Sequence, residues 1–250
     1  EGYLITDKDD DGNDVEEAFG IRDFEKKFFS DKTNKIFCKT FLENCLRDPI
    51  TGEIGKSLIF CVSQKHASKI TQIMNEMGSQ MFPNTYNSDF AVQITSSVQN
   101  AQLYTTQFTN NNLNGKSEFS DYYISSKTRL AITCSMMTTG YDCEDVLNVC
   151  LMKPVFSPSD FIQMKGRGTR KHNFYSNWID KNNLPPIQNP DKVIFKLFDF
   201  FGNCEYFEEK FNYDEVLKLP SRSTSSKGGG ETPLHFDEYE NINPDPLKSL

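Results

Sequence analysis

The sequence lacks any apolar run long enough to cross a membrane, and no charged-then-apolar leader opens it. We therefore expect neither a transmembrane helix nor a signal peptide. The seven cysteines never take the C-x-x-C spacing of metal and redox motifs, and several lie in apolar runs. Reduced thiols in a cytoplasmic protein explain this distribution better than disulfides or zinc do, so no metal site is expected.

The signatures of a complete nucleotide-binding site are also missing. No G-x-x-x-x-G-K-[ST] loop is present: Gly55-Lys56-Ser57 imitates its end, but Ile50 stands where the first glycine is required. No D-E-x-H motif occurs either. An aspartate-rich stretch near residue 10 imitates a calcium loop, yet Ala18 replaces the glutamate that an EF-hand needs. We expect a turn at 51–57 and a solvated acidic loop within residues 1–20.

Composition narrows the class of protein further. A net charge of −8, with many acids in the first 25 residues, argues against an indiscriminate nucleic-acid coat but leaves room for a local basic patch. The 250 residues suffice for one sizeable domain with extensions, or for two small domains. The chain begins with Glu1 instead of Met, which suggests a fragment.

Short apolar runs alternate with helical patterns along the chain. The runs lie near 58–62, 91–95, 130–134, 146–152 and 193–198. This alternation predicts a parallel sheet wrapped by helices. Further expectations are a strand at 2–5 that pairs outside this chain, a helix capped by Ser30, a surface loop at 109–115, and an exposed excursion at 171–192.

Residues 130–170 carry the strongest chemical signal. The stretch TTGYD at 138–142 lies between two expected strands, and QMKGRGTR at 163–170 follows the second strand. Arginine presents a planar fork of donors that matches phosphate oxygens and stays charged. Arg167 and Arg170 are three residues apart, so one helical turn would present both to the same polyphosphate. The plainer alternative is a solvated basic helix end.

These two stretches resemble motifs V and VI of superfamily 2 helicases and translocases. The sequence around these motifs is most similar to the motor (R) subunit of type I restriction–modification enzymes. The similarity is strong over 56–172 and weaker over 193–203. The resemblance implies an α/β fold, a RecA-like (P-loop NTPase-type) sheet without its own P-loop. We expect an acidic loop and helical joining segment at 1–55, the helicase C-terminal lobe at 56–205, and a helix, Gly/Ser linker and flexible tail at 206–250.

The resemblance also implies roles for individual residues. Catalytic arginine fingers would be Arg167 and Arg170. The nucleotide would be approached by Gln163, Gly140, Asp142 and Gly166, with Asp142 near the ribose. The DNA backbone would be contacted by Thr138, Thr139, Ser63, Gln64 and Ser96. Ser63 as a helix cap, and Ser96 as a cap for the helix after residue 100, are the plainer alternatives.

The implied activity is that of the second motor lobe in an ATP-dependent double-stranded DNA translocase, which moves DNA before an endonuclease cleaves it. ATP and Mg²⁺ would be held mainly by a first lobe that this chain lacks, so the chain alone should be inactive. The implied partners are double-stranded DNA, that first lobe, and methylation and specificity subunits. We expect no membrane among the partners. Alternatives are a lobe of a repair or RNA helicase, or a non-catalytic RecA-like interaction module.

Overall fold

The computed structural model describes residues 2–8, 14–20, 30–117, 121–137, 142–187 and 189–210. Strands β1 (Gly2–Lys8) and β2 (Asp14–Gly20) form an antiparallel hairpin in which Gly2 lies opposite Gly20. The expected strand at 2–5 is therefore present, but the expectation that it pairs outside this chain is wrong. The expected linker and tail after residue 210, and most of the acidic loop, lie outside the described residues.

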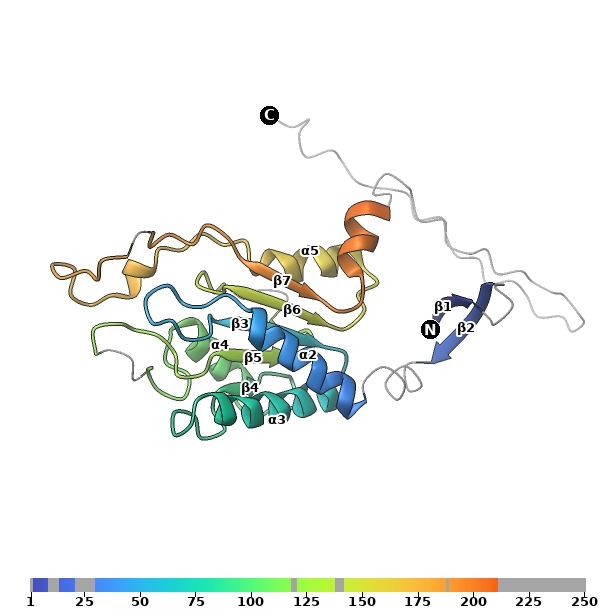
Figure 1. The fold of residues 1–250 in the computed structure, drawn as a ribbon, viewed down its shortest axis with the longest axis horizontal. Helices are drawn as coiled ribbons and strands as arrows, with labels where there is room; N and C mark the ends of the chain where they lie inside the picture. Colours follow the sequence, from blue (N-terminus) through green and yellow to red (C-terminus); the bar gives the residue numbers. More distant parts are fainter. Residues whose placement is uncertain are drawn as a thin grey trace, which may run out of the picture. The chain divides into compact units, whose positions relative to one another are not determined.

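A parallel sheet of five strands forms the centre of the α/β unit, in the order β4–β5–β3–β6–β7 (Figure 1). The strands are β3 (Ser57–Cys61), β4 (Ala91–Gln93), β5 (Leu130–Thr133), β6 (Asn148–Met152) and β7 (Lys196–Asp199). The central strand β3 pairs with β5 on one side and with β6 on the other. Each strand lies in or beside an apolar run that predicted it, so the expected parallel RecA-like α/β fold is confirmed.

Helices cover both faces of this sheet. Their bounds are α2 (Asp31–Asn44), α3 (Gln64–Met81), α4 (Ala101–Thr109), α5 (Pro158–Gly166), η1 (Phe174–Asn177) and η2 (Glu205–Lys210). One buried cluster joins α2 and α3 to the strand face that carries Ile59. A second cluster joins α4, α5 and η2 to the opposite face, which carries Leu58. Successive strand residues point to opposite faces, so a continuous apolar run fills both cores.

Two expected surface segments contribute to the interior instead. In the stretch at 109–115, Asn111 is 7% and Leu113 is 1% exposed, so the expectation of a surface loop is wrong at these residues. The excursion at 171–192 contains η1, whose Phe174 is buried, and Trp178 forms a β-bridge with Tyr123. Helix α2, expected as a joining segment, packs directly into the core, and its cap Ser30 accepts from the backbone N–H of Thr33 as predicted.

No disulfide joins the cysteines, all seven of which lie among the described residues, as the sequence predicted. Burial raises the pKa of Cys61 and Cys150 well above the ordinary thiol value, so both stay protonated within the core. None of the helices in the described part of the chain combines the length and apolarity that a membrane span requires.

Candidate functional site

Helix α5 carries the QMKGRGTR stretch to the amino edge of the sheet. Ser157 caps the helix by accepting from the N–H of Asp160 at 3.4 Å, and Pro158 fills the first turn, where its missing N–H costs nothing. The helix follows β6 and precedes the parallel strand β7, so its carboxyl end returns to the edge where the strands begin. Gln163 is half-buried and donates to Ser159 Oγ at 3.3 Å within the helix.

The two glycines at this helix end have different surroundings. A Cβ on Gly168 would overlap the ring of Phe195, the residue that precedes β7. A Cβ on Gly166 would meet nothing within 4 Å. Gly168 therefore lets the chain pass closely over Phe195, whereas no packing requirement within the described residues explains Gly166.

Asp142 and Arg170 bring the two motif-like stretches together. Arg170 Nε lies 3.1 Å from Asp142 Oδ1, and both side chains are more than half exposed, at 55% and 63%. Arg167 is half-buried at the carboxyl cap of α5, where its backbone N–H donates to Met164 O at 3.2 Å. The candidates Thr138, Thr139 and Gly140 lie outside the described residues.

Close to the Asp142–Arg170 pair in the chain lies a buried network of charged groups that the sequence did not reveal. Lys56, which is 2% exposed, places Nζ 2.8 Å from Asp145 Oδ1 and donates to Asn111 Oδ1 at 2.9 Å. Asn111 in turn donates to the second carboxylate oxygen of Asp145 at 2.9 Å. The turn lies at 49–51, so it only overlaps the expected 51–57, and Lys56 directly precedes β3. The Lys56 ammonium is buried and paired, so it is not a phosphate ligand.

The network keeps both of its charged groups ionised. Burial, the largest single influence, would lower the pKa of Lys56, yet the neighbouring Asp145 and Cys143 together outweigh burial and raise it. Burial would likewise raise the pKa of Asp145, and the Lys56 ammonium lowers it instead. The signal that could have indicated this pair is a charged residue close to the start of each of two buried strands: Lys56 directly precedes β3, and Asp145 precedes β6 by three residues. Neighbouring parallel strands start side by side, so such residues can meet.

The neutral candidates meet at the opposite, carboxyl edge of the sheet. Ser63 follows β3 and caps α3 by accepting from the N–H of His66 at 3.2 Å. Gln64 Nε2 donates to Ser96 Oγ at 3.1 Å, and Ser96 follows β4. Gln64 and Ser96 are exposed, so the structure groups these three residues on one accessible surface. Ser63 is a helix cap as well, whereas Asn100, not Ser96, occupies the cap position of α4.

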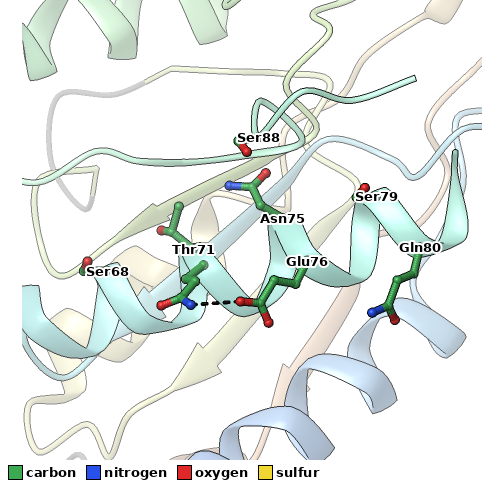
Figure 2. Close-up of a pocket in the computed structure, with 8 residues that line it drawn as sticks. Ser68, Thr71, Asn75, Glu76, Ser79, Gln80 and Ser88 are labelled. Carbon is green, nitrogen blue, oxygen red and sulfur yellow. Dashed lines mark hydrogen bonds between the residues drawn. The ribbon is translucent and has the colours of Figure 1, made fainter. Parts of the chain in front are cut away.

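A polar hollow of about 680 Å³ lies along the outer face of α3, and none of these candidate residues lines it. Figure 2 shows side chains of α3 pointing into it, with Ser88 from the following loop on the far side. Gln72 donates to Glu76 there at 2.8 Å, and no cationic side chain lines the hollow. It therefore lacks the charge that would hold a polyphosphate. No group of three or more metal-ligating side chains occurs within the described ranges.

The sequence of the chain is similar to those of endonuclease subunits of type I restriction enzymes. It is 26% identical over 203 residues to the endonuclease subunit of the type I restriction enzyme EcoKI from Escherichia coli strain K12, which covers 80% of this chain and 14% of that protein. It is 22% identical over 197 residues to the EcoAI endonuclease subunit from Escherichia coli, covering 78% of this chain and 20% of that protein. No family model matches.

Solved structures resemble it at low TM-scores. A fragment of a putative HsdR subunit of a type I restriction enzyme from Vibrio vulnificus YJ016 has a TM-score of 0.45 and 22% identity, covering 74% of this chain and 31% of that chain. The ATP-dependent type ISP restriction-modification enzyme LlaBIII bound to DNA has a TM-score of 0.41 and 13% identity, and the match covers 70% of this chain and 11% of that chain. These scores are low, so the fold assignment rests on the sheet itself.

The five-stranded parallel sheet with helices on both faces gives the chain a RecA-like α/β fold. Over most of its length the chain is homologous to the endonuclease subunits of type I restriction enzymes, of which it spans 14% and 20% in the two relatives named above.

Proposed function

We propose that the chain is the second motor lobe of an ATP-dependent double-stranded DNA translocase in the R subunit of a type I restriction endonuclease. The contact between Arg170 and Asp142 supports this proposal most directly, because it joins the two helicase-like stretches in one exposed, charged site. The homology with two endonuclease subunits supports the restriction-enzyme context. The parent protein, meaning the longer protein that this proposal implies, would be cytoplasmic.

The described residues suit a supporting role in ATP hydrolysis. Arg170 is exposed at the amino edge and Arg167 is half-buried one helical turn earlier, so both guanidinium groups belong to the end of α5. Facing a first lobe that holds ATP and Mg²⁺, they would stabilise negative charge that develops on the transferred phosphoryl group. Gln163, Gly166, Gly140 and Asp142 would approach the nucleotide, with Asp142 near its ribose.

The carboxyl edge suits contact with the DNA backbone. Ser63, Gln64 and Ser96 offer hydroxyl and amide groups, which bind phosphate and sugar oxygens without reading the base sequence. Thr138 and Thr139 would extend this surface. Closure of the two lobes on ATP and their opening after hydrolysis would move these contacts along the duplex, while methylation and specificity subunits supply recognition.

The test is DNA-stimulated ATP hydrolysis by the parent protein. Arg167→Ala should lower the turnover number by about a thousandfold or more while its melting temperature stays close to that of the wild type. Arg47→Ala removes an exposed arginine outside the site and serves as the matched control. Unchanged turnover in Arg167→Ala would leave a non-catalytic interaction module as the better description, and a large fall in melting temperature would assign the arginine to folding.

A further inference from the structure

The backbone of residues 142–145 is fixed from the inside of the lobe. Lys56 Nζ contacts Cys143 Sγ at 3.2 Å and Asp145 Oδ1 at 2.8 Å. The same ammonium donates to the backbone oxygen of Phe108 at 2.6 Å, which ties the segment to the end of α4. Cys143 and Asp145 are 3% and 6% exposed, so these contacts are shielded from water and are stronger than they would be at the surface.

A second set of contacts connects this segment to the chain that follows α5. Glu144 Oε2 lies 3.7 Å from His172 Nδ1, and the backbone oxygen of Glu144 accepts from Lys192 Nζ at 3.0 Å. The backbone N–H of Lys192 donates to His172 O at 2.7 Å. Because burial lowers the pKa of His172, its contact with Glu144 is between a carboxylate and a neutral ring at neutral pH.

The exposed ion pair of Asp142 and Arg170 is too weak to fix the positions of its own two side chains. Asp142 and Arg170 are 63% and 55% exposed, and an ion pair in water contributes little to the ordering of two side chains. Asp142 nevertheless immediately precedes Cys143, whose position is set by the buried ammonium of Lys56. The placement of Asp142, and through it the orientation of Arg170, therefore depends on contacts made inside the lobe.

We propose that Lys56, through its buried ion pair with Asp145, is a positioning residue that holds Asp142 where it orients Arg170 toward the nucleotide. This inference rests on the proposed motor function, because it concerns how the arginine of that function is aimed. Lys56 touches no substrate itself. Its effect on turnover passes through residues 142–145 to the guanidinium of Arg170.

The test replaces the buried pair without leaving a lone charge. Lys56→Met alone would strand the Asp145 carboxylate in the core, so the double variant Lys56→Met/Asp145→Leu is used in the parent protein. We expect DNA-stimulated turnover to fall by about 10- to 100-fold, the scale expected for a misplaced catalytic group, while KM for ATP changes little. If that double variant does not accumulate as folded protein, Lys56→Gln/Asp145→Asn removes both charges and keeps polar groups that can hydrogen-bond in the core.

Arg170→Ala, introduced into both backgrounds, separates positioning from a general loss of structure. If Lys56 acts through Arg170, the arginine substitution lowers turnover steeply in the wild type and by a much smaller factor in the variant. If Arg170→Ala lowered turnover by the same factor in both backgrounds, the two sites would act independently and the inference would be overturned. Unchanged turnover in the double variant would overturn it as well. If Arg170→Ala had no effect in the wild-type background, the motor proposal itself would fail.

Discussion

The two edges of the parallel sheet are built from different chemistry. At the amino edge, the structure pairs buried Lys56 with Asp145 and places the exposed Asp142–Arg170 pair in front of them. At the carboxyl edge, the candidate residues are hydroxyls and an amide, exemplified by the contact of Gln64 with Ser96. Under the proposed function, the charged groups lie where Arg170 would be oriented, and the neutral donors lie where the DNA backbone would be contacted.

Burial explains why the edges differ in this way. A charged group inside a protein needs a partner and hydrogen bonds, and Lys56 has both. His66, a buried titratable group near the carboxyl edge, instead carries no charge. It is 6% exposed and lies 3.2 Å from Asn34 Oδ1, and burial lowers its pKa to about 4, so it remains neutral.

The largest stability effect that tests this difference is the titration of His66. Its folded-state pKa of about 4 lies below the ordinary value of 6.5, so the unfolded chain binds the proton first as the pH falls. The stability that the neutral ring provides is present above pH 6.5 and is lost as the pH falls through about 4. Summed over that window, the loss is at most about 3 kcal/mol.

Denaturant unfolding of the wild type and His66→Gln, measured between pH 7 and pH 4, checks this expectation. The glutamine amide does not titrate in this range, so the variant should lose less stability than the wild type does. Parallel curves for the two proteins would show that His66 is not held neutral, and the contrast between the two edges would lose its clearest case.

The glycines of the α5 end provide a smaller and more local test. Gly168→Ala places a methyl group against the ring of Phe195, so we expect a loss of about 1–3 kcal/mol in the free energy of unfolding. Gly166→Ala meets open space and should leave stability unchanged or slightly improved. In the parent protein, Gly166→Ala should still lower turnover if the nucleotide approaches there. Equal stability losses in both variants would contradict the packing argument.

The smallest expected effect concerns the carboxyl edge. Ser63→Ala removes the cap of α3 and should cost about 1 kcal/mol of stability, whereas Ser96→Ala removes only an exposed contact and should cost less. Both should weaken DNA binding by the parent protein without changing the slope of affinity against salt, because neither hydroxyl releases counterions. A changed slope would show that this surface acts through charge and would remove the distinction between the edges.

Sequence patterns predicted the sheet well because each strand lies in or beside a contiguous apolar run that is visible locally. They also placed Asp142 and Arg170 in one site, through the resemblance of two short stretches. They missed the burial of Lys56 and its pairing with Asp145, because Gly55-Lys56-Ser57 looks like a turn and Asp145 is distant in the chain. Asn111 was misjudged for the same reason: its burial depends on tertiary contacts that an Asn-rich stretch does not reveal.

The most direct measurement of the central claim is ATP hydrolysis by the parent protein, with and without double-stranded DNA, in the wild type, Arg170→Ala and the control Arg47→Ala. We expect DNA to stimulate turnover in the wild type and the control, and Arg170→Ala to lower the stimulated turnover about a thousandfold or more. Stimulated turnover that persists in Arg170→Ala would contradict the account and reduce the contact with Asp142 to a structural feature of the lobe.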